Sequence, residues 1–310
     1  MNDADADGAA DADAPDDGSA GPRPDVDAGV GSGPGPLADR EWRLVRDEAR
    51  PGPMQMALDE VAAETAAAGG PRTVRVYSWA PSCLSLGYGQ DPDTVDWDAC
   101  EERGVDVTRR QTGGGGIYHD ARGDVSYSLA VPRSELPGDL VEAYHVLCEP
   151  LLRALSRLGV PAGYADRELP ALYEPACYLR GLHPAHDVVA FEGEGEGEGV
   201  RKLSGNAQYR RRDAVVQHGS LTHEARPGAH LGVFAAPGVG TGAFADRVAG
   251  VAEFAAVWRA DVVGALEDAF AEWADATVGR WTDDELRRAR ERASEKYEDE
   301  GWVRRRAGER

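Results

Sequence analysis

Apolar side chains recur at helical spacing in two early segments of the chain. The first segment, residues 54–62, is followed by glycines and a proline at 69–71 that end a helix. The second begins at Asp139, with Glu142 three residues later as in a capping box, and its leucine-rich face extends to Gly159. Both segments predict amphipathic helices of the kind that cover a sheet.

Two more helices are predicted towards the C-terminal end of the chain. One covers residues 261–273. The other starts at Thr282, which has Glu285 three residues later, and extends to Tyr297.

Short apolar or alternating runs predict the strands. They occupy residues 41–45, 73–79, 83–88, 105–107, 125–131, 188–191 and 214–216. Because these runs are interspersed with the helices, the pattern predicts an α+β fold in which helices lie beside a sheet.

The remaining segments have low complexity. Residues 1–37 contain mostly Asp, Ala, Gly and Pro, so we expect a disordered acidic tail followed by a single catalytic domain at 38–310. The Glu-Gly alternation at 192–199 predicts a solvated hairpin extension, because glycine weakens a strand. With 310 residues and 42% apolar side chains, the chain can bury a substantial core.

The chain is strongly acidic. Its formal net charge is −21, and ten Asp against two Arg give the first 40 residues a share of −8. We expect an acidic, lysine-poor surface that holds hydration and stays soluble at high salt, as in halophile-like proteins. Nucleic acid is not an expected partner, because contacts to phosphates need a basic stripe.

The cysteine spacing and the hydropathy of the chain indicate the cellular compartment in which the protein is expected. Cys83, Cys100, Cys148 and Cys177 form no C-x-x-C pair and no metal-ligand spacing, so we expect neither a disulfide framework nor a metal site. The chain contains no run of eighteen apolar residues and no basic-then-apolar leader. We therefore expect a soluble, cytoplasmic protein with no membrane partner.

Lysine is nearly absent from the chain. Only two lysines occur among the 34 basic side chains, and Lys202 stands directly before Leu-Ser-Gly-Asn-Ala-Gln. An ammonium is a compact charge on a flexible stem, whereas a guanidinium is a planar fork that keeps its proton. Lys202 is therefore the first catalytic candidate, and chance survival in an arginine-biased sequence is the alternative.

Four successive glycines, residues 113–116, lie between Arg109-Arg110 and Tyr118-His119-Asp120. Bare glycines let the backbone approach a ligand closely and direct its N–H groups at an anion. The spacing matches neither a P-loop nor a dinucleotide-binding fingerprint. A flexible linker is the alternative, but the flanking residues and the β-like runs on either side favour a binding loop.

Three motifs, at residues 54–60, 109–120 and 202–221, follow one another in a fixed order. They resemble the N-M-A-L-D-E helix, the R-R-x-[ST]-G-G-G-x-x-x-H-D loop, and the K-[IV]-[SA]-G-[NS]-A-Q and H-G-[ST]-L segments of one family. That family comprises the lipoate-protein ligases and the lipoyl-pathway octanoyltransferases, which share a fold with the biotin ligases. The resemblance covers residues 41–305 and implies a central mixed β-sheet flanked by helices, with a tunnel for a medium-length acyl chain.

The resemblance also implies a set of site residues. In the family, the lysine that matches Lys202 contacts the acyl carbonyl, and glycine N–H groups would share the negative charge that develops on its oxygen. For His119 and His218, a place near the reacting end and a purely structural role are both open. The expected substrate-binding residues are Arg110, Thr112, Gly113, Gly114, Gly115, Gly116, His119, Ser204, Gly205, Asn206 and His218.

Two reactions occur in this family, and the chain carries signals for both. Ligases activate free lipoate with ATP and Mg as an acyl-adenylate, whereas one class of octanoyltransferases takes octanoate from acyl carrier protein and holds it on a cysteine. Gly115 is typical of the ligases, because the cysteine-dependent transferases more often have Arg at that position. Cys177, upstream of Lys202, stands where those transferases have their nucleophile, and a small buried hydrophobe is the alternative role.

The ligase pattern is incomplete in two places. His186-Asp187 stands where ligases usually have Asn-Asp, and few residues follow Trp302, where ligases that perform both half-reactions have an accessory domain. A ligase would therefore need a separate accessory subunit.

The favoured hypothesis is an ATP-dependent lipoate-protein ligase that joins a lipoyl or octanoyl chain to a lysine of a lipoyl carrier domain. Carrier domains of this kind belong to 2-oxoacid dehydrogenase E2 and to the glycine-cleavage H protein. The alternative is an octanoyltransferase that uses acyl carrier protein and a Cys177 thioester. A third hypothesis is a non-catalytic acyl-binding protein.

Overall fold

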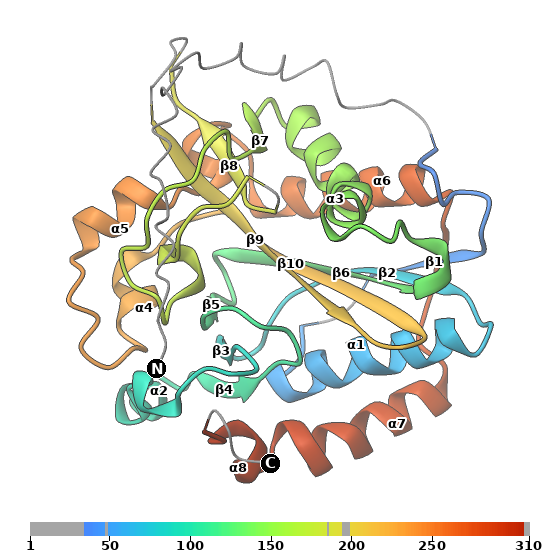
Figure 1. Ribbon diagram of the computed structural model, residues 1–310, viewed down its shortest axis with the longest axis horizontal. Helices are drawn as coiled ribbons and strands as arrows, with labels where there is room; N and C mark the ends of the chain where they lie inside the picture. Colours follow the sequence, from blue (N-terminus) through green and yellow to red (C-terminus); the bar gives the residue numbers. More distant parts are fainter. Residues whose placement is uncertain (1–33, 47–48, 185, 194–198, 307–310) are drawn as a thin grey trace, which may run out of the picture.

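The computed structural model describes residues 34–46, 49–184, 186–193 and 199–306. An eight-stranded sheet with helices on both faces forms its centre, and a three-stranded sheet lies beside it (Figure 1). The strands are β1 (Trp42–Arg46), β2 (Arg72–Tyr77), β3 (Cys83–Leu86), β4 (Asp106–Arg109), β5 (Ile117–His119), β6 (Asp124–Pro132), β7 (Ala162–Tyr164), β8 (Val188–Phe191), β9 (Val200–Arg210), β10 (Ala214–Thr222) and β11 (Thr277–Gly279).

The large sheet has the strand order β11-β1-β2-β6-β10-β9-β8-β7. β1 pairs in parallel with β11 and β2, and the other neighbours pair antiparallel, so the sheet is mixed. Its longest ladder joins β6 to β10, from the Asp124–Thr222 pair to the Pro132–Ala214 pair. The predicted α+β fold with a central mixed sheet is confirmed.

Helices on both faces bury the sheet. They are α1 (Gly52–Ala67), α2 (Trp97–Glu102), α3 (Leu140–Arg157), α4 (Pro227–Leu231), α5 (Thr241–Arg247), α6 (Arg259–Ala274), α7 (Asp283–Arg292), which continues as one π turn at Ala293–Tyr297, and α8 (Glu300–Val303). α3 and α6 lie on one face of the large sheet, and α1 and α7 lie on the other (Figure 1).

The helix ends follow the predicted caps. The Asp139 carboxylate accepts the N–H groups of Val141 and Glu142 at 2.9 Å each, which starts α3. At the start of α7, Thr282 and Glu285 form the predicted capping box. All four predicted helices are therefore confirmed, each within a few residues of its expected bounds.

The small sheet holds the glycine loop at both ends. β3 pairs with β4, which leads into the loop, and with β5, which follows it. Leu84 and Ile117 of this sheet pack in one buried cluster with Tyr178 and Leu179 of the turn that begins at Cys177. The loop and this turn are thus held by the same apolar core.

Lys202 lies in a strand that the sequence pattern does not predict. β9 pairs with β8 and β10, which correspond to the predicted runs at 188–191 and 214–216. From Asn206 to Arg210 the residues of β9 are only half buried, because they border open pockets rather than core. A strand of this kind lacks the apolar alternation that identifies one in a sequence.

The boundary of the acidic tail also differs from expectation. Leu37 is only 6% exposed, and its carbonyl accepts the ring N–H of Trp42 at 2.8 Å. The folded part therefore includes Leu37. Most of the tail, residues 1–33, and residues 194–198 of the Glu-Gly segment lie outside the described residues. The Glu192 N–H donates to the Gly199 carbonyl, which continues the β8–β9 hairpin into that segment.

Within the described ranges, no helix combines the length and hydropathy that a membrane span needs.

Candidate active site

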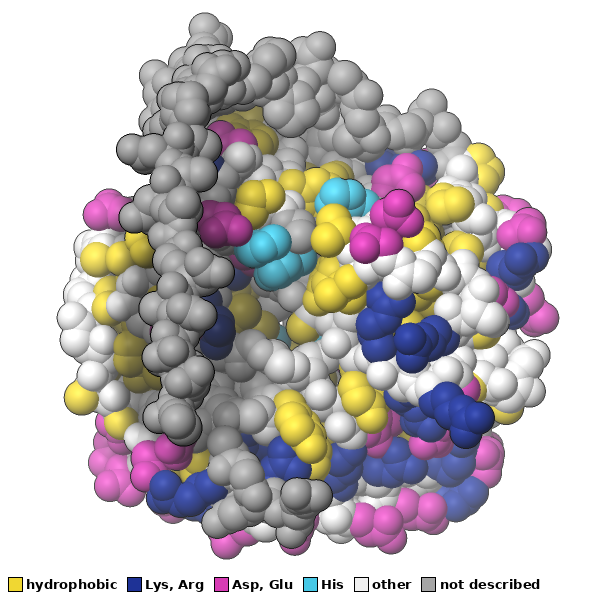
Figure 2. Space-filling model, viewed as in Figure 1, with side chains coloured by type: hydrophobic (Ala, Val, Ile, Leu, Met, Phe, Trp, Pro, Cys, Tyr) yellow, Lys and Arg dark blue, Asp and Glu magenta, His cyan; other side chains and the backbone are white. Residues whose placement is uncertain are grey.

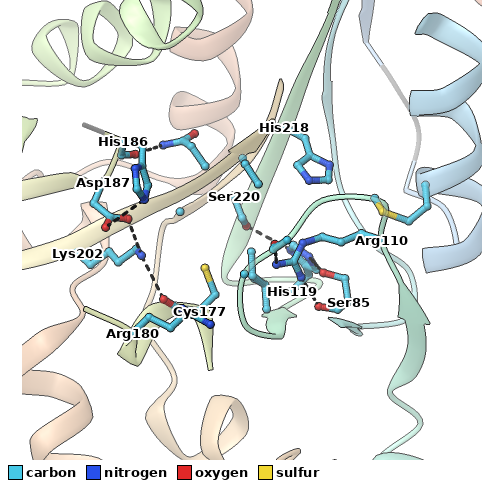
Figure 3. Close-up of a pocket in the computed structure, with 18 of the residues that line it drawn as sticks. Ser85, Arg110, His119, Cys177, Arg180, His186, Asp187, Lys202, His218 and Ser220 are labelled. Atoms are coloured by element: carbon cyan, nitrogen blue, oxygen red, sulfur yellow. Dashed lines mark hydrogen bonds and ion pairs between the residues drawn. The ribbon is translucent and has the colours of Figure 1, made fainter. Parts of the chain in front are cut away.

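A pocket lies between β9, β10, the glycine loop and the turn at Cys177 (Figure 3). It contains about 660 Å³ of empty space, its open mouth included. Met56, Tyr77, Trp79 and Ile117 form an apolar wall. The polar lining consists of Ser85, Arg110, His119, Cys177, Arg180, His186, Asp187, Lys202, Asn206, His218 and Ser220. An apolar cavity with a few convergent polar groups is typical of a small-molecule site.

Arg110 shapes the glycine loop from inside. Its guanidinium donates to the carbonyl groups of Ser85, Gly113 and Gly115 at 2.6, 2.8 and 2.7 Å, and to the Thr112 hydroxyl at 2.9 Å. Burial lowers the pKa of Arg110 to about 10, so it remains charged at neutral pH. Arg110 lines the pocket as expected, but most of its donors are used by the protein itself rather than left for a substrate.

The glycine loop binds the Cys177 turn directly. The Gly116 N–H donates to the Pro175 carbonyl at 2.7 Å, and the Cys177 N–H donates to the Gly116 carbonyl at 2.9 Å. A Cβ atom on Gly115 would lie 2.7 Å from the Pro175 carbonyl oxygen and 2.9 Å from the Cys177 nitrogen. Glycine is therefore required at 115 for this close approach.

Lys202 is fixed beside Cys177. Its ammonium lies 2.7 Å from an Asp187 carboxylate oxygen and donates to the Cys177 carbonyl at 3.1 Å (Figure 3). Burial alone would lower the pKa of Lys202, but its electrostatic interactions with Cys177 and Asp187 raise that pKa above its ordinary value. The Cys177 sulfur lies near Gly205, where an added Cβ atom would be 3.2 Å from Sγ and 4.0 Å from the Lys202 nitrogen.

His119 lies in a buried cluster on the other side of the pocket. Its ring stacks on Trp79 at 4.0 Å between centroids, and its nitrogens lie 2.9 Å from the Ser85 hydroxyl and 3.4 Å from the Ser220 hydroxyl. Burial and the positive charge of Arg110 hold the pKa of His119 well below its ordinary value. His119 is therefore neutral at pH 7 and held in a fixed orientation.

His218 joins the helix motif to the glycine loop. One ring nitrogen lies 3.1 Å from an Asp59 carboxylate oxygen, and the other lies 2.9 Å from the Thr112 hydroxyl. Burial would raise the pKa of Asp59, but the hydrogen bond to His218 and the charge of Arg75 lower it, so the carboxylate stays ionised. Both nitrogens of His218 are thus engaged, although its ring lines the pocket.

Most of the expected site residues meet at this pocket. Its lining includes Lys202, Cys177, Arg110, Gly113, Gly114, His119, Gly205, Asn206 and His218.

Four expected substrate-binding residues do not line the pocket. Gly115 and Gly116 face the Cys177 turn, and the Gly116 N–H is already bound to a carbonyl. The Thr112 hydroxyl lies between Arg110 and His218. Ser204 is fully buried beside the Tyr127 hydroxyl. Each of these residues supports a neighbouring group, and their expected role as direct substrate contacts stays a prediction.

Asp187 is the main residue missing from the expected site. It is 2% exposed, and it accepts the His183 N–H at 2.9 Å as well as pairing with Lys202. A carboxylate next to a strand beside the Lys202 segment is a usable sequence signal, since a buried ammonium needs a counter-charge. Trp79 and Ser85 were also missed, and their strand-like surroundings provide no such signal.

Among the described residues, no three His, Cys, Asp or Glu side chains gather in a group that could hold a metal ion.

The mixed sheet, its helix layers and the pocket define a biotin/lipoate ligase-like catalytic domain. A bipartite lipoate protein ligase from Thermoplasma acidophilum, described together with its E2 lipoyl domain, has this fold with a TM-score of 0.69 and 24% identity over 86% of this chain and 96% of its own. The family profile of the lipoyl protein ligase A/B catalytic domain matches residues 51–270. The chain belongs to that family.

Two curated relatives are named octanoyltransferase LipM. The protein from Kyrpidia tusciae is 34% identical over 282 residues, which is 84% of this chain and 97% of the relative. The protein from Symbiobacterium thermophilum is 37% identical over 187 residues, or 59% of this chain, and that match spans only 65% of the relative's own length. These names fit the octanoyltransferase alternative better than the ligase hypothesis that the sequence favoured.

Proposed function

We propose that this protein is an octanoyltransferase that moves a medium-length acyl chain from acyl carrier protein to a lysine of a lipoyl domain through a thioester on Cys177. One observation carries the proposal: the Cys177 turn lies between the glycine loop and the Lys202 ammonium, with its sulfur at the pocket. The names of the LipM relatives support the same reaction.

Gly115 no longer favours a ligase. The sequence interpretation took this glycine as a ligase signal, but the Pro175 and Cys177 backbone atoms approach it so closely that no side chain fits. The small residue therefore fits a cysteine turn packed on the loop. The thioester route also needs neither ATP nor Mg, so neither is part of the proposal.

In the first step, the Cys177 sulfur attacks the carbonyl carbon of the octanoyl thioester. A new C–S bond forms, the bond to the carrier thiol breaks, and that thiol leaves with the proton that Cys177 has lost. Lys202 keeps its ammonium charge throughout, because its raised pKa leaves it protonated. That charge favours the thiolate of Cys177 and the oxyanion that forms during attack.

The glycine loop supplies further donors for the oxyanion. The N–H groups of Gly113, Gly114 and Gly115 have no protein acceptor among the described residues. Gly113 and Gly114 line the pocket, so their donors are available to a bound carbonyl oxygen. Met56, Tyr77 and Trp79 form an apolar wall against which the hydrocarbon chain can pack.

In the second step, the neutral amine of the acceptor lysine attacks the Cys177 thioester. A C–N bond forms, the C–S bond breaks, and Cys177 returns as the thiolate while the amine loses a proton to solvent. The acceptor belongs to a lipoyl domain such as that of 2-oxoacid dehydrogenase E2 or of the glycine-cleavage H protein. The Thermoplasma ligase was described together with its E2 lipoyl domain, which supports a partner of this kind.

The proposal is tested by offering both donors to the purified protein with an apo lipoyl domain. Octanoyl-acyl carrier protein without ATP should give octanoylated lipoyl domain, whereas octanoate with ATP-Mg should not. Intact-mass spectrometry before the acceptor is added should find an octanoyl group on the enzyme that neutral hydroxylamine removes. Cys177→Ser should abolish both the adduct and the transfer.

A matched control is Cys100→Ser, because Cys100 is 2% exposed and lies outside the pocket. That variant should keep the adduct and the transfer. Product that forms only with ATP would support the ligase hypothesis, and product with neither donor would favour the acyl-binding protein.

A further inference from the structure

Four arginines surround the turn of the β9–β10 hairpin. Arg210, Arg211 and Arg212 are consecutive, and Arg133 of the neighbouring strand end donates to the Arg211 carbonyl at 3.3 Å. We call this set the arginine tip. Figure 2 shows dark blue side chains gathered over the end of this hairpin and along α7 below it.

Three of the four arginines of the arginine tip lack a counter-charge among the described residues. Within the described ranges, Arg133, Arg210 and Arg212 have no carboxylate within 4.0 Å, and Arg211 has Asp213 at 3.3 Å and Glu64 at 3.7 Å. The Arg-rich α7 differs, since Arg287, Arg288 and Arg292 all pair with Asp or Glu. An uncompensated basic surface on a chain of net charge −21 is suited to an anionic partner.

The arginine tip is connected to the pocket along β9. Ala207 lines the acyl pocket, and Tyr209 and Arg211, two and four residues further, line an adjoining open groove. Ala207 and Tyr209 share one side of β9, and Arg211 directly follows its last residue, so four residues at 3.3 Å each give about 13 Å from the pocket to the tip. Acidic side chains in this groove are already engaged, because Glu60 pairs with Arg292 and Lys296.

We propose that the arginine tip is the docking surface for the acyl carrier protein, on which the phosphodiester of the prosthetic arm and nearby carboxylates bind. This inference rests on the proposed function. Guanidinium groups bind phosphate in a bidentate way, and the arm can then follow β9 so that its thioester reaches Cys177. The lipoyl domain brings its acceptor on a lysine without a phosphate, so the tip is assigned to the donor carrier.

The double variant Arg133→Glu/Arg212→Glu tests the surface without breaking a contact to a carboxylate. Both residues are exposed, and neither belongs to the pocket. The KM for octanoyl-acyl carrier protein should rise roughly tenfold, because the variant replaces the positive charge that attracts the anionic carrier with negative charge that repels it. The KM for octanoyl-pantetheine, which lacks both carrier and phosphate, and the KM for the lipoyl domain should stay unchanged.

Arg122→Glu is the matched control. Arg122 is exposed and lies beside the opposite end of the β6–β10 ladder, about 26 Å from the tip at 3.3 Å per residue. It should leave all three KM values unchanged. A higher salt concentration should raise the wild-type KM for octanoyl-acyl carrier protein, because salt screens the attraction. The difference in this KM between the wild type and the double variant should then become smaller.

Two results would overturn the inference: an unchanged carrier KM in the double variant, or a rise in the KM for the lipoyl domain instead. Direct binding of fluorescent octanoyl-acyl carrier protein separates this inference from the proposed function. Binding that the double variant loses supports docking even if the wild type transfers nothing, in which case only the proposed function fails. Equal binding by both proteins would exclude the docking surface.

Discussion

At Lys202, burial and charge act on the same ammonium in opposite directions. Burial in the pocket wall disfavours the charged form, whereas Asp187 at 2.7 Å and Cys177 favour it more strongly, so the pKa rises. A buried ion pair of this kind contributes little to stability, because desolvation offsets the attraction. It is therefore better understood as a fixed positive charge next to the proposed nucleophile.

Lys202→Arg should lower the rate of thioester formation by about 10²–10³-fold, as expected for loss of an oxyanion-stabilising group. The planar guanidinium keeps the charge but is wider than the ammonium that fits between Asp187 and the Cys177 carbonyl. The rate is measured by mass spectrometry of the acylated enzyme, with circular dichroism to check the fold. Lys296→Arg is the control and should have no effect, since a guanidinium there can still pair with Glu60. Full activity of Lys202→Arg would refute the assigned role.

Among the elements, the glycine loop acts on the Cys177 turn as much as on a ligand. Its two ends belong to β4 and β5, Arg110 holds its carbonyl groups, and its last residue bonds the turn in both directions. Gly115 and Gly116 thus position the proposed nucleophile, while Gly113 and Gly114 border the pocket. One short run of glycines has two separate structural tasks.

Gly115→Ala should slow transfer by about 10²-fold, because displacement of a reacting group by roughly 1 Å has an effect of that size. The added methyl would lie 2.7 Å from the Pro175 carbonyl oxygen and must push the Cys177 turn away. The measurement is the rate of Cys177 acylation together with the Tm. Gly89→Ala, in the neighbouring loop, meets no atom within 4 Å and should leave both unchanged. An unaltered acylation rate in Gly115→Ala would show that the turn is not positioned by this contact.

Local signals in the sequence predict the helices and most strands, since caps and apolar periods are properties of short segments. The caps at Asp139 and Thr282 are examples. β9 was missed because its polar face borders a pocket, and the sequence alone did not indicate that Gly115 packs against the Cys177 turn. The contact that explains Gly115 is made by residues about sixty positions away in the chain. Such packing leaves no local pattern in the sequence, whereas Asp187, beside the Lys202 segment, could have been found from the need of a buried ammonium for a counter-charge.

At the scale of the whole molecule, α7 near the C-terminal end of the chain is bonded to β1 and α1 near the N-terminal end. Glu285 of α7 binds Arg43 of β1 at 2.8 Å and the Thr65 hydroxyl of α1 at 2.8 Å. Burial would raise the pKa of Glu285, but the hydrogen bonds from Arg43 and Thr282 lower it to about 2. The pair lies on the side of the large sheet away from α3 and α6, so it bears on stability rather than on the pocket.

Glu285→Gln should lower the free energy of unfolding at pH 7 by about 3 kcal/mol, because it leaves the buried Arg43 charge unpaired. A carboxylate with a lowered pKa stabilises the fold above its unfolded pKa and loses that effect as the pH falls through the folded value. The wild-type advantage should therefore be complete above pH 4.5 and disappear towards pH 2. Urea titrations at several pH values measure it. Glu291→Gln is the control, since it removes an exposed pair with Arg287 and should change the free energy of unfolding far less. A pH-independent difference for Glu285→Gln would contradict this prediction.

The scarcity of lysine has a consequence for the proposed reaction, whose product is an acylated lysine. The two lysine amines of the chain are Lys202, 3% exposed and clamped by Asp187, and Lys296, bound to Glu60 at 2.7 Å. The thioester proposed at Cys177 would therefore face no free lysine on the surface of the protein that carries it. The protein would therefore acylate its own lysines poorly, and the acyl group would remain on Cys177 until another protein provides a lysine amine.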